Sequence, residues 1–279
     1  MNYQFGLIGY PVNHSLSPWI HQQFMSAVGL EGAYLLFETP VEKLDERLKQ
    51  LKQDQIHGFN VTVPYKQKVM AFLDEVDADA DRIGAVNTVV NQGGRWKGYN
   101  TDGIGYIRSL RKEFPDLFSS EKRVLILGAG GAARGIYRVL VNAGFQKVDI
   151  ANRTKEKAEG LLDLQEVHTE TAIYGYKEAE DTLDKYDLIV QTTSVGMSPD
   201  KGKQIISLKK LHPHTVVSDI IYNPLTTQLL QEASDQGARV HRGHTMLLYQ
   251  ARYAFEIWTG TQPAMNGIVS QLEKRLRGI

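Results

Sequence analysis

The stretch Val124-Leu125-Ile126-Leu127-Gly128-Ala129-Gly130-Gly131-Ala132-Ala133-Arg134 decides the fold class of this chain. A short apolar run breaks into glycines and then into helix formers, the pattern of a strand, a tight turn and a helix start. Gly128 permits the turn, Gly130 lets the backbone approach a pyrophosphate, and Ala133 allows the helix to pack closely on the strand. The N–H groups of the first helical turn would face the phosphates. The sequence therefore predicts a dinucleotide-binding unit.

The residues after the next predicted strand, Lys147 to Ala151, indicate which dinucleotide binds. About 20 residues beyond the glycines, an NAD enzyme places an Asp or Glu on the adenine ribose. This chain has Asn152-Arg153-Thr154 there, with Lys157 one turn further on. A cation at this position suits a 2′-phosphate, and Asp149 lies inside the strand, too early to reach the ribose. We therefore expect NADP(H) as the cofactor.

Composition excludes several classes of function. The chain has 279 residues, of which 42% are hydrophobic, so it can bury a normal core in one large or two smaller domains. Lys plus Arg and Asp plus Glu each number 32, giving no net charge and no indication of a nucleic acid or anionic membrane as partner. There is no cysteine, and no apolar run has the length of a membrane span. A cytoplasmic protein without a metal is expected.

Strand and helix patterns already alternate before the glycine motif. We expect two α/β domains: an N-terminal open α/β substrate domain and a Rossmann dinucleotide-binding domain, with a cleft between them. The Rossmann domain is predicted to span 103–242. Two late helical patterns, Met246 to Trp258 and Met265 to Leu276, have no strand left to cover and are expected to return to the first domain. The substrate domain would then comprise 1–102 plus 243–279.

Polar groups follow several predicted strands of the first domain. Ligands of open α/β sheets bind outside the carboxyl ends of the strands. Hydroxyls and amides there suit a neutral polyol, while Lys66 and Asp102 suit proton transfer at an alcohol or ketone. The four segments are Gly9 to Pro18, Asn60 to Lys66, Gly84 to Thr88 and Asn100 to Gly103.

Each of these residues also has a purely structural interpretation. Ser17 can be an N-cap before Pro18, and Asp102 the N-cap of a helix that starts at Gly103. Lys66 can be a solvated lysine at a helix start. Thr62 can be an ordinary strand residue and Asn87 a turn former. Only their combination with a nicotinamide site favours function.

The motifs together resemble those of the shikimate dehydrogenases, in order and over nearly the whole chain. The matching segments are His14 to Pro18, Asn60 to Lys66, Gly84 to Thr88, Asn100 to Gly103, Gly128 to Ala133, Asn152 to Thr154, Thr192 to Met197, Asp219 to Pro224 and Met246 to Ala251. The resemblance implies an NADP-dependent oxidoreductase that reversibly reduces 3-dehydroshikimate to shikimate. It also implies a place in chorismate and aromatic amino acid biosynthesis.

The resemblance further implies a role for individual residues. Lys66 and Asp102 would be the catalytic pair, and Ser15 and Ser17 would hold the substrate carboxylate. Hydroxyl and ring contacts would come from Asn60, Thr62, Asn87 and Gln250. Tyr222 and Gly243 would lie where substrate meets nicotinamide. The cofactor would contact Gly128, Ala129, Gly130, Gly131, Ala132, Ala133, Asn152, Arg153, Thr154, Lys157, Thr192, Met197 and Ile220.

Two departures from the family pattern concern the nicotinamide end: Gln191 replaces a common Asn, and Arg242-Gly243-His244-Thr245 replaces a more usual Asp/Asn-Gly-Leu-Gly. Two other functions remain open: an NAD-using quinate/shikimate dehydrogenase, and a non-catalytic NADP(H) sensor on the same fold. The absence of an acid near Arg153 argues against the first, and the presence of Lys66 and Asp102 against the second. The sequence does not determine the oligomeric state; a homodimer is one candidate assembly.

Overall fold

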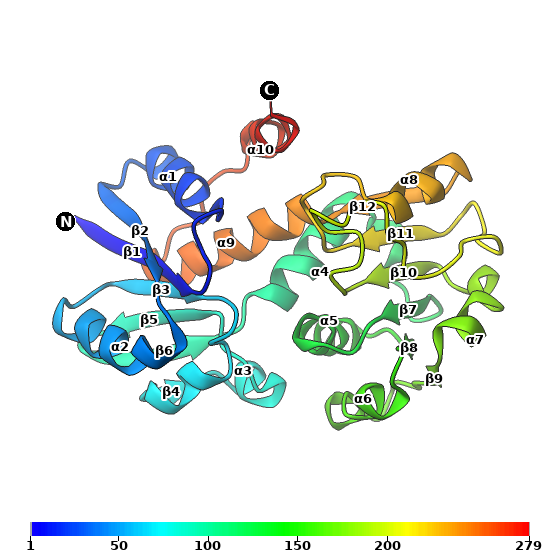
Figure 1. Cartoon of the computed structure of the whole chain (residues 1–279), viewed down its shortest axis with the longest axis horizontal. Helices are drawn as coiled ribbons and strands as arrows, with labels where there is room; N and C mark the ends of the chain where they lie inside the picture. Colours follow the sequence, from blue (N-terminus) through cyan, green and yellow to red (C-terminus); the bar gives the residue numbers. More distant parts are fainter. Residues whose placement is uncertain (1, 279) are drawn as a thin grey trace. The chain divides into compact units, whose positions relative to one another are not determined.

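The computed structural model describes residues 2–278, and the chain divides into two compact units. Unit 1 runs as far as Thr101 and adds Gln250–Asn266, while unit 2 contains Asp102–Tyr249 and the segment from Gly267. Each unit is built around its own six-stranded sheet (Figure 1). The predicted two-domain α/β class with a Rossmann domain is confirmed.

The sheet of unit 1 has the strand order β2-β1-β3-β5-β6-β4. β1, β2 and β3 are mutually parallel, β5 is antiparallel to both β3 and β6, and β4 is parallel to β6. The strands are β1 (Tyr3–Gly9), β2 (Gly32–Glu38), β3 (Gly58–Val61), β4 (Glu75–Val76), β5 (Thr88–Gln92) and β6 (Arg95–Tyr99). The helical segments are α1 (Ser17–Val28), η1 (Val41–Lys43), α2 (Leu44–Gln53), η2 (Lys68–Phe72) and α3 (Ala78–Ile83).

Apolar spacing explains how α2 packs in unit 1. Leu44, Leu48 and Leu51 recur at helical intervals, and all three are buried in one core cluster with Phe59 and Trp96. The same apolar spacing begins at Val41, but the chain forms a 3-10 turn there and becomes an α-helix only at Leu44. Lys66, considered above as a residue at a helix start, lies two residues before the 3-10 helix η2.

The sheet of unit 2 is entirely parallel, in the order β12-β11-β10-β7-β8-β9. This is the doubly wound order of a Rossmann fold. The strands are β7 (Arg123–Leu127), β8 (Lys147–Ala151), β9 (Ile173–Tyr174), β10 (Leu188–Gln191), β11 (Val216–Asp219) and β12 (Arg239–Arg242). The helical segments are α4 (Asp102–Glu113), η3 (Pro115–Leu117), α5 (Gly131–Asn142), α6 (Lys155–Glu159), η4 (Leu162–Leu164), α7 (Tyr176–Glu180), η5 (Leu183–Lys185), α8 (Gln228–Asp235) and α10 (Ile268–Arg277).

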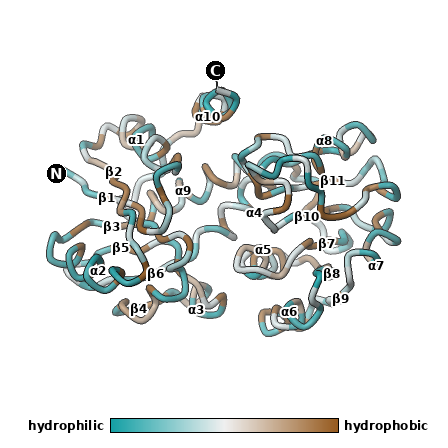
Figure 2. The backbone as a smooth tube through the Cα atoms, in the orientation of Figure 1, coloured by the Kyte–Doolittle hydropathy of each residue, from teal (hydrophilic) through white to brown (hydrophobic). Residues whose placement is uncertain are grey.

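Strand β7 shows why its sequence is apolar without alternation. Val124 and Ile126 belong to one core cluster, and Leu125 and Leu127 to another. Successive side chains of a strand point to opposite faces, so both faces of this sheet are covered. Hydrophobic segments coincide with the central strands in Figure 2, whereas α2 and α10 are mostly hydrophilic.

The late helices divide differently from the predicted domain boundaries. Helix α9 (Gly243–Thr259) begins in unit 2 and continues into unit 1, whereas α10 groups with unit 2. Within unit 2, the Nε2 atom of His244 lies 3.0 Å from the Oε1 atom of Glu273 on α10. None of the helices formed by residues 2–278 combines the length and apolar character of a membrane span.

Candidate functional site

The glycine turn of unit 2 has a conformation that requires glycine. Gly128 follows β7 with a φ of 113°, and its N–H donates to the carbonyl of Ala151 over 2.8 Å. A Cβ atom at Gly128 would lie 2.7 Å from both Thr192 Oγ1 and Thr193 Cγ2. Backbone conformation and close packing therefore both explain this residue, which brings the end of β10 against the turn.

The start of helix α5 is suited to a phosphate group. Gly130 is its N-cap and provides no side chain to bond the first helical N–H groups. A Cβ atom at Gly130 or Gly131 would meet no atom within 4 Å, so the space beside the turn is open. Free N–H groups and the helix dipole favour an anion there. Ala129 and Ala132 lie in the same turn, and Ala133 is fully buried against the core. These residues fit the pyrophosphate of a dinucleotide.

An exposed cation follows the next strand. Arg153 and Lys157 are exposed, and neither forms an ion pair with any carboxylate among residues 2–278, whereas Lys155 pairs with Glu178 at 2.7 Å. Asn152 is braced by a 2.7 Å hydrogen bond from its Nδ2 to the Thr154 carbonyl. Arg153 is thus available to an external anion.

Asp149, an acid within β8, is already used by the fold. Asp149 is 5% exposed. Its carboxylate accepts the N–H of Ala172 at 2.9 Å and the hydroxyl of Tyr186 at 2.8 Å, and it lies 3.5 Å from Arg123 Nη2. This agrees with the prediction that Asp149 sits too early in the strand to select NAD.

The unusual Gln191 braces the loop that follows β10. Its Nε2 donates to the carbonyls of Thr193 and Val195, each at 3.1 Å, and its Oε1 accepts the N–H of Thr193. Thr192 donates its hydroxyl to the Leu127 carbonyl at 2.7 Å. The loop is therefore held against the glycine turn, while Met197 at its far end is 46% exposed.

Asp219, at the end of β11, supports the neighbouring turn. Burial raises the pKa of Asp219 to about 6, against hydrogen bonds from the N–H of Ile221 and the hydroxyl of Thr227. Ile220 and Tyr222 flank that N–H donor. Burial also raises the pKa of the half-buried Tyr222.

The second unusual segment, Arg242 to Thr245, points its side chains into unit 2. A Cβ atom at Gly243 would lie 2.3 Å from the Ile220 carbonyl oxygen, so the segment packs tightly on the end of β11. Arg242 donates to Thr226 at 3.2 Å, and Thr245 donates to the Arg242 carbonyl at 2.9 Å. His244 faces Glu273. These departures therefore serve the scaffold of unit 2.

In unit 1, a buried hydrogen-bond network joins three of the predicted substrate residues. Asn60 donates from Nδ2 to the Asn87 carbonyl at 3.2 Å and to Thr88 Oγ1 at 3.0 Å. Asn87 accepts the N–H of Thr101 at 2.8 Å and donates to its hydroxyl at 3.0 Å. Thr101 in turn donates to Gln250 Oε1 at 3.4 Å. The network fixes the orientation of both asparagine amides.

The two predicted serines lie together in the loop between β1 and α1. Ser17 donates its N–H to Ser15 Oγ at 3.2 Å, and both residues are half-buried. The N-cap of α1 is Leu16, and no side chain caps this helix, so the N-cap interpretation of Ser17 is wrong. The end of β1, from which the loop starts, lies against Thr62, because a Cβ atom at Gly9 would lie 2.3 Å from its Cγ2.

Each of the two predicted catalytic residues follows a strand of the sheet of unit 1. Lys66 follows β3 and accepts the N–H of Val86 at its backbone carbonyl over 2.8 Å. Asp102 follows β6 and is the first residue of α4, which places it in unit 2. Both side chains are half-buried. Most substrate candidates thus lie in unit 1 and the cofactor candidates in unit 2, while Asp102 and Tyr222 belong to unit 2.

The sequence did not indicate three other residues that belong to the buried hydrogen-bond network of Asn60, Asn87 and Gln250. Thr88 and Thr101 stand beside Asn87 and Asp102 in the quoted motifs, so adjacency to a candidate was the available signal. Tyr34, which donates its hydroxyl to Asn60 Oδ1 at 2.8 Å, lies in the middle of β2 and gave no signal.

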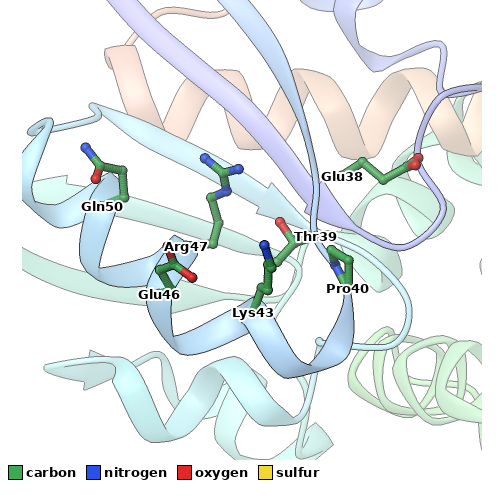
Figure 3. Close-up of a pocket in the computed structure, with 7 residues that line it drawn as sticks. All are labelled: Glu38, Thr39, Pro40, Lys43, Glu46, Arg47 and Gln50. Carbon is green, nitrogen blue, oxygen red and sulfur yellow. The ribbon is translucent and has the colours of Figure 1, made fainter.

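A pocket of about 530 Å³ lies elsewhere in unit 1, at the end of β2 and along α2 (Figure 3). No predicted site residue lines it, and its two acidic and two basic side chains balance in charge. The lining residues are Glu38, Thr39, Pro40, Lys43, Glu46, Arg47 and Gln50. Within residues 2–278, no group of three or more His, Asp and Glu side chains is arranged to hold a metal ion.

Comparison with known proteins assigns the chain to a family. Models for the shikimate dehydrogenase substrate binding domain, for shikimate / quinate 5-dehydrogenase and for the shikimate 5′-dehydrogenase C-terminal domain match residues 7–89, 109–221 and 243–264. A shikimate dehydrogenase (NADP(+)) of Oceanobacillus iheyensis is 50% identical over 280 residues, which cover 100% of both chains.

Solved structures agree with this assignment. The shikimate 5-dehydrogenase of Thermus thermophilus in complex with NADP(H) and shikimate is 34% identical, with a TM-score of 0.86 over 99% of each chain. A quinate dehydrogenase from Corynebacterium glutamicum in complex with NAD is 29% identical, with a TM-score of 0.88 over 100% of this chain and 99% of that one. From its motifs, its two sheets and these relatives, the chain belongs to the shikimate dehydrogenase family.

Proposed function

We propose that this protein is an NADP-dependent shikimate dehydrogenase, which reversibly reduces 3-dehydroshikimate to shikimate on the route to aromatic amino acids. One observation carries the choice of cofactor within the family. The exposed, unpaired Arg153 follows β8 where an NAD enzyme has an acid, and Asp149 is committed to the sheet.

The cofactor would be held by the residues of unit 2 that form the turn and the adjoining loops. The N–H groups at the start of α5 would bind the pyrophosphate, and Arg153 with Lys157 would bind the 2′-phosphate. Thr192, Met197, Ile220 and Gly243 would line the remainder. Bound NADPH supplies the hydride, and this chain supplies orientation and proton transfer.

The substrate would be held by the polar residues of unit 1. Ser15 and Ser17 offer hydroxyl donors to its carboxylate, while Thr62, Asn87 and Gln250 offer contacts to its hydroxyls. Asn60 already donates both amide hydrogens within the protein, so its part is to orient Asn87. The resemblance to the family adds Tyr222 as a further candidate for a substrate contact.

Lys66 and Asp102 would perform the acid–base chemistry. As an ammonium, Lys66 donates a proton or a hydrogen bond to the oxygen that gains negative charge during reduction. Asp102 would be the second member of this catalytic pair. Oxidation of shikimate reverses the proton transfer.

A spectrophotometric assay with shikimate or quinate and with NADP or NAD tests the proposal. Shikimate with NADP should give the highest kcat/KM of the four combinations. A site built from paired hydrogen-bond donors and acceptors discriminates against an altered polyol, so quinate, with its saturated ring and added hydroxyl, should be used less efficiently. Equal efficiency on both substrates would indicate a quinate/shikimate dehydrogenase, and no turnover would indicate a sensor.

We further propose that the protein forms a homodimer and that it is located in the cytoplasm. A homodimer would be detected by light scattering of the purified protein. A cytoplasmic location would be detected by cell fractionation.

A further inference from the structure

The C-terminal end of β2 contacts both the last residue of β1 and the serine-bearing loop that follows it in unit 1. The N–H of Thr39 donates to the Gly9 carbonyl at 3.0 Å. Glu38 Oε2 accepts the N–H of Val12 at 3.0 Å, across 26 positions of the chain. In Figure 3 the Glu38 side chain extends away from Lys43 and Glu46, which line the same pocket. Glu38 therefore uses its carboxylate on the loop.

The contact continues from Val12 to Ser15. The Val12 side chain is 4% exposed, and its carbonyl accepts the N–H of Ser15 at 2.9 Å. Ser15 Oγ then accepts the N–H of Ser17 at 3.2 Å. One peptide segment, from Val12 to Ser17, is thus fixed by a series of hydrogen bonds that begins at a carboxylate.

A carboxylate is a stronger acceptor for a backbone N–H than a neutral oxygen, but the geometry needs only an acceptor at this point. The negative charge itself offers no advantage to a loop proposed to receive a carboxylate. Position and charge are therefore separable: Glu38→Gln keeps an acceptor oxygen and removes the charge, whereas Glu38→Ala removes both.

We propose that Glu38 is a positioning residue that sets the affinity for the substrate carboxylate by fixing the loop of Ser15 and Ser17. This inference rests on the proposed function. Its effect should fall on the KM for shikimate. The KM for NADP and the kcat should change little, because the Glu38 carboxylate bonds to the loop that is proposed to hold the substrate carboxylate.

Steady-state kinetics of three variants test the inference. Glu38→Ala should raise the KM for shikimate about tenfold and change kcat less than threefold. Glu38→Gln should stay within twofold of the wild type, and so should Glu46→Ala, a matched removal of an acid from the same pocket. An unchanged KM in Glu38→Ala, or an equal loss in Glu38→Gln, would overturn the proposal. So would a parallel rise in the KM for NADP.

Amide hydrogen exchange of Val12 provides a readout that does not depend on activity. The Val12 amide should be protected in the wild type and in Glu38→Gln, and this protection should be lost in Glu38→Ala. Exchange of the amides of β1 and β2 should stay unchanged in all three proteins. Persistent protection in Glu38→Ala would refute the positioning contact. An inactive wild type with the expected exchange pattern would refute the proposed function while supporting the contact.

Discussion

Arg153 is the residue on which cofactor choice depends. Its guanidinium should contribute on the order of 1.5–3 kcal/mol through charge-assisted hydrogen bonds to the 2′-phosphate. Arg153→Ala should therefore raise the KM for NADP about tenfold or more and leave the KM for NAD nearly unchanged. Lys155→Ala is the matched control, because Lys155 is also a cation after β8 but pairs with Glu178. Equal changes for both cofactors would remove Arg153 from the site.

Lys66 and Asp102 are expected to act as one catalytic unit. Each alanine variant should lower kcat by about 100-fold or more, the scale of acid–base catalysis. The kcat of the double variant should be little lower than that of the less active single variant. When two residues act as one unit, removing either of them already abolishes their joint contribution. The measurement is kcat with shikimate and NADP at saturation. A near-normal kcat in Lys66→Ala would show that Lys66 only positions the substrate or is an ordinary surface residue.

At this scale the sequence predicted residue types better than their contacts. The candidates Asn60, Asn87 and Gln250 were named from motifs, and the structure joins them through Thr101. The donation from Tyr34 could not be predicted, because it depends on which β2 residue faces the end of β3. The scaffold role of Gln191 likewise depends on a loop conformation that local sequence does not specify.

Among the elements, the turn between β7 and α5 depends most on one residue. Gly128→Ala should destabilise the protein by about 1–3 kcal/mol, because it puts a side chain at positive φ and against Thr192 and Thr193. Gly131→Ala is the matched control, since its Cβ atom would meet nothing within 4 Å. Thermal unfolding should show a lowered Tm for the first variant only. Equal Tm values would mean that the turn relaxes.

Element prediction succeeded where the pattern was strong and local. The limits of β8 agree with the predicted strand Lys147 to Ala151, and the apolar run quoted from Val124 to Leu127 lies within β7. The sequence did not reveal β4, which is only two residues long, or α3, a six-residue helix whose buried residues are Ala80 and Ile83. Their formation depends on pairing with β6 and on neighbouring packing.

At the scale of the whole molecule, Asp219 should make stability depend on pH. Its pKa in the folded protein is about 6, above the ordinary 3.8, so folding favours the protonated form. The contribution of Asp219 to the free energy of unfolding is fully present below about pH 3.8, where the carboxyl is protonated. It is lost as the pH rises through about 6. Asp219→Asn lacks this titration. Its free energy of unfolding relative to the wild type should increase by about 2 kcal/mol between about pH 4.5 and pH 7.5.

Urea unfolding of both proteins at the two pH values measures this difference. The amide of Asn keeps one acceptor oxygen for the N–H of Ile221, and its NH2 group can donate to the hydroxyl of Thr227. A difference that does not vary with pH would show that Asp219 titrates at its ordinary pKa.

The continuous helix α9 has a consequence for how this chain acquires its fold during synthesis. A ribosome completes residues 1–101 first, yet that portion lacks Phe255 and Trp258, both buried in the finished unit 1. Trp258 stacks on Phe5 with ring centroids 4.7 Å apart and donates to the Val89 carbonyl at 2.9 Å. Unit 2 likewise includes α10, which the ribosome synthesises last. Both units should therefore reach their native state only after the ribosome has passed α9, so a nascent chain arrested at Tyr249 should still be sensitive to protease.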